Sequence, residues 1–183
     1  MTVIVVSGLP CTGSSTIASL LAQKLAFRFF SVGAYYKKKS QEHLGGRTET
    51  DQALQFLQNR EGASADFHLD LDELQRGIAQ QGNVVIDGKL SIHLLQGLWD
   101  FSVWITASYD VRAERLHQRD GISVNDAIEK IKQRECLERK LWSQIYEFDY
   151  VQQEKEASLV IDTTNKKPEE IVQMIITAIK KKT

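Results

Sequence analysis

Residues 3–25 read VIVVSGLPCTGSSTIASLLAQKL, and this stretch determines the fold that we expect for the rest of the chain. The apolar run 3–6 predicts a buried strand, and the segment from Ser14 onward has the spacing of an amphipathic helix. Between them, Gly8 and Gly13 let the backbone turn so that successive N–H groups point into one concavity. The start of the helix adds its dipole and its unpaired N–H groups. The stretch therefore predicts a loop that binds a polyphosphate.

This loop follows the P-loop pattern except at one position. G-x-x-x-x-G-K-[ST] has a lysine after the second glycine, whereas this chain has Ser14 there. Ser15 stands where a hydroxyl would hold Mg²⁺, but the charge that usually bridges two phosphates is missing. A glycine loop between a strand and a helix also occurs in Rossmann-type folds, so a structural turn is the alternative interpretation. The residues of the predicted phosphate site are Gly8, Leu9, Pro10, Cys11, Thr12, Gly13, Ser14, Ser15 and Thr16.

The composition is that of an ordinary globular protein. The chain has 183 residues, 42% of them apolar and 26% charged, which predicts one domain over residues 1–183. The net charge of −1 gives no reason to expect nucleic acid or an anionic membrane as a partner. Cys11 and Cys136 form neither a C-x-x-C pair nor a metal-ligand cluster, and no leader or long apolar run is evident. We therefore expect a cytoplasmic protein.

Strand and helix patterns alternate along the remaining chain. Further strands are predicted at residues 29–32, 84–86, 101–106 and 159–162. Helical segments are predicted at 33–43, 51–59, 66–79 and 109–119, then from Ser123 to about 145, and from Pro168 to the lysine-rich end; 91–98 is a short segment of unassigned type. Because most of the strands are apolar on both faces, this order predicts the α/β class. We expect a doubly wound, mostly five-stranded parallel sheet with helices on both faces.

Polar residues follow several of these strands. The carboxyl ends of parallel strands meet at one edge of a sheet, which is where such folds bind ligands. Asp87 follows the strand at 84–86 and is placed like a Walker-B carboxylate that holds Mg²⁺ with Ser15, although Asp-Gly is also a common turn. Lys37 and Lys89 follow strands at the same edge and could hold an acceptor phosphate. Ordinary surface lysines are the alternative.

Arginines gather in the segment after the fourth predicted strand. Arg112, Arg115 and Arg119 lie at helical spacing, and Arg134 and Arg139 follow on the next helix. Two such helices could form a lid that brings guanidinium groups over phosphates. The alternative is a solvated helix face on which the acidic partners are Glu114, Glu135 and Glu138.

Several stretches resemble the short nucleoside monophosphate kinases, most closely the archaeal-type cytidylate kinases. SGLPCTGSSTIASLLAQKL resembles their opening, in which a hydroxyl residue commonly replaces the P-loop lysine. SVGAYYK is similar to the segment after their second strand, and VVIDGKL to the segment that contacts CMP. VRAERLHQRDGISVNDAIEKIKQRE resembles their lid. The resemblance implies a P-loop kinase fold with a helical acceptor-binding region at about 33–80 and a lid at about 112–141.

The resemblance also implies an activity and roles for particular residues. It implies that ATP with Mg²⁺ donates a phosphoryl group to CMP or dCMP. The loop from Gly8 to Thr16 inherits the ATP site, and Ser15 and Asp87 the metal. The acceptor would contact Lys37, Asp72, Gly88 and Lys89, and the lid arginines that act on the phosphates would be Arg115, Arg119 and Arg134.

The chain departs from the family mainly on the acceptor side. Lys37 and Lys89 stand where arginines are expected, and Leu141 where the lid would carry another arginine. His68 replaces an acidic residue and Cys11 a glycine. Three hypotheses follow: a cytidylate kinase-like enzyme, a catalytically weakened nucleotide-binding protein, or a P-loop kinase for another small phosphate or hydroxyl acceptor.

Overall fold

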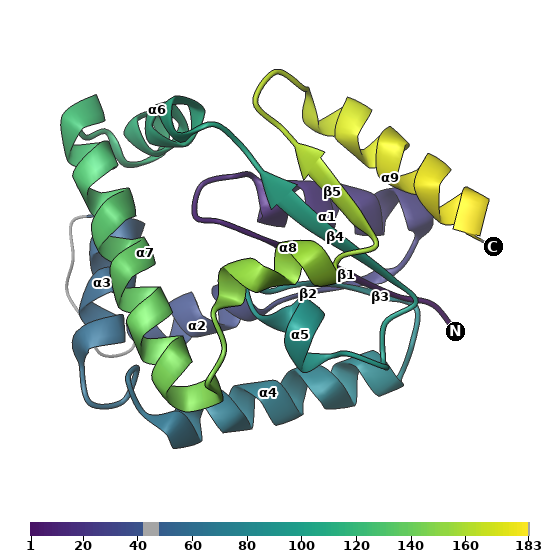
Figure 1. The fold of residues 1–183 in the computed structure, drawn as a ribbon, viewed down its shortest axis with the longest axis horizontal. Helices are drawn as coiled ribbons and strands as arrows, with labels where there is room; N and C mark the ends of the chain where they lie inside the picture. The colour runs from purple at the N-terminus through teal and green to yellow at the C-terminus, as the bar shows by residue number, and fades with distance from the viewer. Residues whose placement is uncertain (42–47, 183) are drawn as a thin grey trace.

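The computed structural model describes residues 1–41 and 48–182, and its centre is one parallel sheet (Figure 1). The five strands of the described chain are β1 (Val3–Gly8), β2 (Arg28–Ser31), β3 (Val84–Asp87), β4 (Phe101–Thr106) and β5 (Leu159–Asp162). They lie in the order β2-β3-β1-β4-β5, and every neighbouring pair is parallel. The predicted parallel sheet is confirmed, and β1 with its phosphate loop lies in the middle of it.

Helices connect the strands and cover both faces of the sheet. They are α1 (Ser14–Leu25), α2 (Val32–Gln41), α3 (Glu49–Gln58), α4 (Ala65–Gln80), α5 (Ser91–Leu94), α6 (Tyr109–Asp120), α7 (Val124–Tyr146), α8 (Gln153–Glu156) and α9 (Pro168–Lys182). A 3₁₀ turn, η1 (Tyr150–Gln152), precedes α8. None of the helices in these described ranges is long and apolar enough to cross a membrane.

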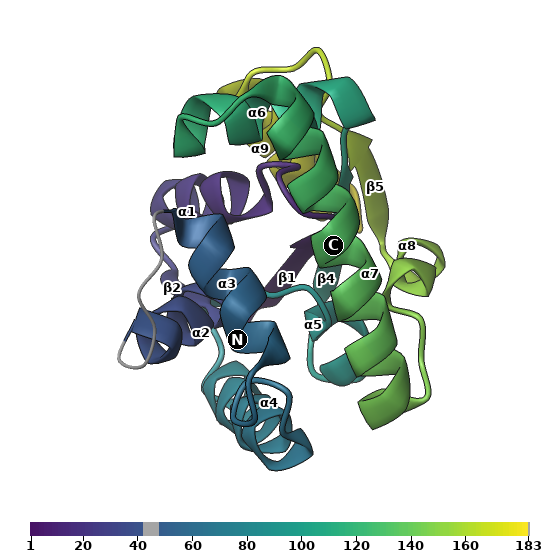
Figure 2. The ribbon, with the colours of Figure 1, turned by 90° about the vertical axis from the view of Figure 1, so that its left-hand side faces the viewer.

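The side chains of β1 alternate between two hydrophobic cores. Ile4 and Val6 pack with α1 and α9 on one face of the sheet. Val3 and Val5 pack on the other face with side chains of α4, α5 and α7. Figures 1 and 2 show these two helical layers with the sheet between them. The continuous β-branched run of β1 is thus buried on both faces, which is the doubly wound arrangement that the sequence predicts.

The two edge strands, β2 and β5, are less buried than the three inner strands. The strand expected at 29–32 begins at Arg28 and ends at Ser31, and Val32 already starts α2. Side chains on both edge strands are exposed, as Phe29 (41%) and Val160 (43%) illustrate. An edge strand has a neighbour on one side only, and fewer helices cover its faces. The expectation of strands buried on both faces therefore holds for β1, β3 and β4.

Other differences concern short elements. The short segment at 91–98, whose type the sequence leaves open, begins with the four-residue helix α5, and Gly97 takes a left-handed conformation soon after this helix ends at Leu94. Neither η1 nor α8 was predicted, because each is too short for a periodic pattern. Part of the polar loop expected before α3, together with His43 at the end of the predicted helix 33–43, lies outside the described residues.

The two helices α6 and α7 form a small unit of their own. Gly121 ends α6 in a left-handed conformation, and the Ser123 side chain accepts the N–H of Asp126 to cap α7, as the sequence predicts. Ala113, Leu116, Ala127 and Ile131 form a separate apolar cluster between the two helices, and α3 lies against α7 (Figure 2).

Candidate active site

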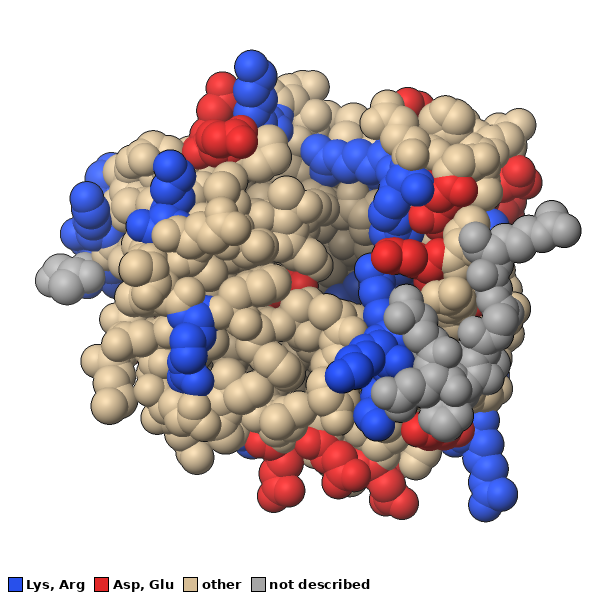
Figure 3. All heavy atoms as spheres, turned by 180° about the vertical axis from the view of Figure 1, so that it is seen from behind, with Lys and Arg blue, Asp and Glu red and all other residues tan. Residues whose placement is uncertain are grey.

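A cavity of about 330 Å³ opens at the carboxyl ends of β1, β2 and β3. The hollow is visible in Figure 3, with basic side chains along one side of its mouth. It brings together ten of the residues that the sequence singled out: Pro10, Cys11, Ser15, Lys37, Asp72, Asp87, Gly88, Lys89, Arg119 and Arg134. The other predicted residues lie outside its lining: Gly8, Leu9, Thr12, Gly13, Ser14, Thr16 and Arg115.

The loop between β1 and α1 is held by its own side chains and by the sheet. A Cβ on Gly8 would lie 2.5 Å from the carbonyl oxygen of Ile105 on β4, so only glycine fits there. The Thr12 hydroxyl donates to the Leu9 carbonyl at 2.9 Å and closes the turn. Gly13 caps α1 at φ 93°, and Cys11, in the lining, also has a positive φ of 64°. The loop is therefore a fixed, left-handed turn at the head of α1.

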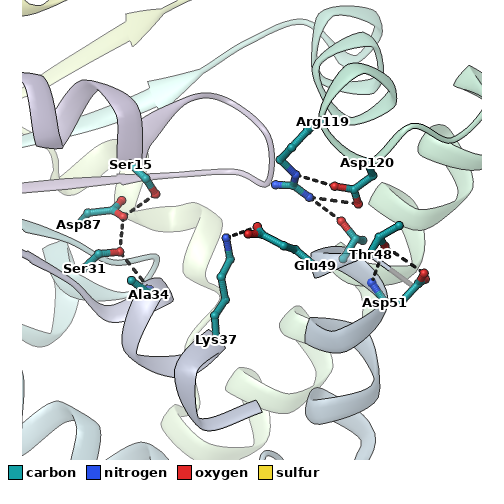
Figure 4. Close-up of polar contacts among 11 residues, drawn as sticks. Ser15, Ser31, Ala34, Lys37, Thr48, Glu49, Asp51, Asp87, Arg119 and Asp120 are labelled. Carbon is teal, nitrogen blue, oxygen red and sulfur yellow. Dashed lines mark hydrogen bonds and ion pairs between the residues drawn. The ribbon is translucent and has the colours of Figure 1, made fainter. Parts of the chain in front are cut away.

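A carboxylate and two hydroxyls form the floor of the cavity. The Ser15 hydroxyl donates to Asp87 Oδ2 at 2.6 Å, and the Ser31 hydroxyl donates to the same oxygen at 2.9 Å (Figure 4). Asp87 is only 4% exposed. Burial raises the pKa of Asp87, and the hydroxyls that donate to it act in the opposite direction. Three oxygen-bearing side chains from three elements thus converge beside the phosphate loop, and oxygen ligands are those that Mg²⁺ prefers.

The basic side of the cavity contains a triad of charged side chains, in which the acid is buried and the two cations are partly exposed. Lys89, just after β3, donates to both carboxylate oxygens of Glu138, and Arg134 Nε donates to Glu138 Oε1 at 2.8 Å. Glu138 and Arg134 both belong to α7. Burial lowers the pKa of Lys89 to about 8; the charge of Arg134 adds to this shift and Glu138 opposes it. Glu138 is one of the acidic partners that the sequence alternative names, but it is only 2% exposed, so this pair does not lie on a solvated helix face.

A second group of charges lies at the first turn of α3, across the cavity mouth from the Ser15 group in Figure 4. Lys37 Nζ donates to Glu49 Oε2 at 2.6 Å. Arg119 contacts Asp120 at 2.7 Å and the Thr50 hydroxyl at 2.6 Å. These contacts join α2, α3 and α6 around the opening.

Two other arginines of α6 lie outside the cavity lining and donate hydrogen bonds to the loop between β1 and α1. Arg115 donates to the carbonyl oxygens of Thr12 (2.9 Å) and Thr163 (3.0 Å). Arg112 is buried, forms an ion pair with Glu135 and donates to the Pro10 carbonyl at 3.3 Å. Both guanidinium groups thus contact main-chain carbonyls of the loop, and Arg115 lies beside the loop rather than in the lining of the cavity.

At the far end of the cavity lies a polar network that the sequence indicated only in part. Asp72 accepts from the Tyr146 hydroxyl at 2.6 Å and from Gln75 at 3.0 Å, and Gln75 accepts from Ser91 at 2.7 Å. Burial raises the pKa of Asp72, whereas its two donors lower it. His68, Asp72 and Gln75 repeat along the buried face of α4, and polar residues on such a face are the sequence signal for this network.

The fold is that of the P-loop kinases. It is similar to the fold of shikimate kinase from Aquifex aeolicus, with a TM-score of 0.57 and 23% identity. The match covers 98% of this chain and 97% of the shikimate kinase. It is also similar to an uncharacterized protein from Eubacterium ventriosum, with a TM-score of 0.72 and 15% identity over 98% of both chains.

Sequence comparison identifies the family within this class. Residues 3–165 match the model of the cytidylate kinase-like family, and the chain belongs to that family. It is 36% identical to the cytidylate kinase of Ignicoccus hospitalis over 96% of this chain and 97% of that one. The cytidylate kinase of Methanocaldococcus jannaschii is 31% identical, with 97% of each chain covered.

Proposed function

We propose that this protein transfers the γ-phosphate of ATP to CMP or dCMP and so forms ADP with CDP or dCDP. The observation that carries the proposal is that one cavity is lined by the Ser15–Asp87 pair beside the phosphate loop and by the basic pair Lys89 and Arg134. Kinases of this class need a site for the donor polyphosphate and metal next to a site for an anionic acceptor. Family membership supports the same reaction.

In this proposal the donor polyphosphate binds to the loop from Gly8 to Thr16. The main-chain N–H groups of the loop and the start of α1 supply its binding energy. Ser15 and Asp87 would hold Mg²⁺, because a buried carboxylate 2.6 Å from a hydroxyl is an oxygen donor set that suits this ion. When bound, the metal supplies positive charge to the phosphates. Arg115 would position the loop through Thr12 rather than contact the phosphates.

The acceptor would occupy the rest of the cavity. Its phosphate would lie near Lys89 and Arg134, with Lys37 and Arg119 at the mouth and Gly88 leaving room beside β3. Its base would reach Asp72, where a carboxylate can accept the amino N–H of cytosine but finds no such donor on uracil. Under this assignment, 33–80 is the acceptor-binding region and 112–141 the lid.

The chain itself has little covalent chemistry to perform. A nucleotide phosphate is already an anion at neutral pH, so no general base is needed. The protein contributes position and charge: the loop fixes the donor, the lysines and arginines fix the acceptor, and helices α6 and α7 cover both.

The experiment that tests the proposal measures ADP release with CMP, dCMP, UMP, AMP and GMP as acceptors. We expect turnover with CMP and dCMP above the other three. Asp87→Asn should lower kcat at least 100-fold, because loss of a charged contact to the phosphates or their metal costs about 3 kcal/mol of transition-state stabilisation. Turnover confined to another acceptor, or full activity of Asp87→Asn, would refute it.

One observation favours a second candidate, a nucleotide-binding protein with weakened catalysis. Lys89 and Arg134 share the carboxylate of Glu138, and Ser14 stands in place of the P-loop lysine, so less positive charge is available to the phosphates. Measurable ATP binding without ADP release for any of the five acceptors would favour this candidate.

A further inference from the structure

Glu138 is the one acid of the triad and its most deeply buried side chain. It is 2% exposed, yet it lies in the lining of the cavity that Cys11 and Ser15 reach from the phosphate loop. A buried carboxylate stays ionised only if cations and hydrogen-bond donors replace its hydration. Lys89 and Arg134 do this together. The contact is therefore a built feature of the site and not a loose surface pair.

The triad joins two elements that are distant in the sequence. Lys89 follows β3, and its own carbonyl oxygen accepts from the buried side chain of Gln153 at 2.6 Å. Arg134 lies one helical turn before Glu138 on α7. The carboxylate thus holds a lysine and an arginine side by side, in the arrangement in which two oxygens of one phosphate group could contact both.

The charges of the triad do not match a phosphate dianion. Lys89 and Arg134 contribute two positive charges and Glu138 one negative charge, which leaves a net charge of about +1 where a nucleotide phosphate brings about −2. An anion that enters must therefore compete with a carboxylate already in contact with both cations. In a poorly hydrated cavity this competition is costly, because charges a few ångströms apart interact by several kcal/mol.

We propose that Glu138 is a positioning and specificity-determining counter-ion of the acceptor site. It holds Lys89 and Arg134 in place for the acceptor phosphate and at the same time weakens their affinity for simple anions. An anion then binds well only when the remainder of the ligand makes further contacts in the cavity. The Glu138 carboxylate, which repels anions, would thus give the site its specificity. The identification of this anion as the acceptor's phosphate rests on the proposed function.

The experiment titrates sulfate, a dianion throughout the neutral range, into the protein at pH 6.5 by calorimetry. Glu138→Gln should bind sulfate at least tenfold more tightly than the unchanged protein. Glu129→Gln is the matched control, because it removes the same charge from the same helix but pairs with the exposed Lys132 outside the cavity, and its sulfate affinity should stay within twofold. In the double variant Lys89→Gln/Glu138→Gln the gain should disappear, which assigns it to this triad and not to the phosphate loop.

Activity supplies a second readout. Glu138→Gln should lower kcat for CMP while ribose 5-phosphate, which lacks the base, becomes a stronger competitive inhibitor. Glu138→Asp keeps the charge but is too short to contact both cations, so we expect a lower kcat and a sulfate affinity between that of the unchanged protein and that of Glu138→Gln. If Glu138→Gln does not fold, Glu138→Asp tests the positioning role in its place. An unchanged kcat in Glu138→Asp would overturn that role.

The two proposals fail in different ways. Unchanged or weaker sulfate binding in folded Glu138→Gln overturns the role of Glu138 even if the protein releases ADP with CMP. A gain that persists in the double variant overturns it too. Absence of ADP release with CMP refutes the proposed function, while the sulfate titration still reports on the anion site.

Discussion

Individual side chains in the cavity work in pairs that join distant parts of the chain. Ser15 and Asp87 are 72 positions apart, and Lys89 and Glu138 are 49 positions apart. Each pair places a charged group where burial alone would penalise it, so the partner determines its charge state. Single substitutions in these pairs should therefore change ligand binding more than they change the fold.

Gly13→Val should lower ATP affinity at least tenfold. Gly13 has a φ of 93°, and a β-branched residue is a true outlier there, at a cost of about 1–3 kcal/mol. Space is not the obstacle, since the nearest atom to an added Cβ is Arg115 Nη1 at 3.9 Å. The loop would relax to another main-chain conformation and its N–H groups would no longer converge. ATP titration by calorimetry measures the effect, and tight binding by the folded variant would contradict it.

The pH dependence of turnover should show the lowered pKa of Lys89, which burial brings to about 8. In the protein without bound acceptor, Lys89 loses its proton as the pH rises through this value. The kcat/KM for the acceptor should then fall by up to tenfold per pH unit. Lys89→Arg should abolish this decline because arginine stays protonated. Lys37→Arg is the control and should keep the decline. A decline that survives in Lys89→Arg would assign it to another group.

At the scale of helices and strands, the sequence predicts the elements that have a strong hydrophobic pattern. β4 and β5 have the predicted bounds, and the alternating burial of β1 follows from its β-branched run. The rule that parallel strands end at one edge places Asp87 near Ser15, and the two lie 2.6 Å apart. This much of the site follows from the order of the elements alone.

The sequence could not predict which group each cation contacts. Arg115 and Arg119 have the same helical spacing, yet Arg115 turns to the carbonyl of Thr12 and Arg119 to the hydroxyl of Thr50. Such choices depend on how α6 and α7 lie over the sheet, and no local pattern encodes this orientation. The contact between Lys89 and Glu138 could not be predicted from the sequence for the same reason.

Two glycines should respond oppositely to alanine, which tests the packing between β3 and α2. A Cβ on Gly88 would overlap the Ser91 hydroxyl, which is buried and bonded to Gln75, and would lie 2.8 Å from Val32 Cγ2. We expect Gly88→Ala to lower the free energy of unfolding by about 1–3 kcal/mol. Gly77, inside α4, has no atom within 4 Å of an added Cβ, so Gly77→Ala should raise it by about 0.5–1 kcal/mol.

Urea denaturation of both variants measures these changes as shifts in the midpoint at constant slope. Equal midpoints for the two variants would mean that the turn after β3 has room to adjust.

At the scale of the whole molecule, the first turn of α3 connects the two helical parts on either side of the cavity. Glu49 contacts Lys37 of α2, Thr50 contacts Arg119 of α6, and Asp51 contacts Lys130 of α7. We define these three contacts as the α3 clasp. Because Lys37 and Arg119 also line the cavity, closure of α6 and α7 over a ligand should depend on these contacts. Figure 4 shows the Lys37–Glu49 pair with Arg119 on the same side.

Asp51→Asn should loosen the α3 clasp without unfolding α3, because asparagine still accepts the hydrogen bond from the Thr48 hydroxyl that Asp51 accepts at 2.9 Å. The lost attraction is that of a partly exposed ion pair, about 0.5–1 kcal/mol. Amide hydrogen exchange in α6 and the first turns of α7 should therefore accelerate about two- to fivefold, while exchange in β1 and β4 stays unchanged. Glu129→Gln is the matched control, since it removes the exposed pair with Lys132 close by on α7. Equal exchange in the two variants would mean that contacts other than the clasp hold α6 and α7 against α3.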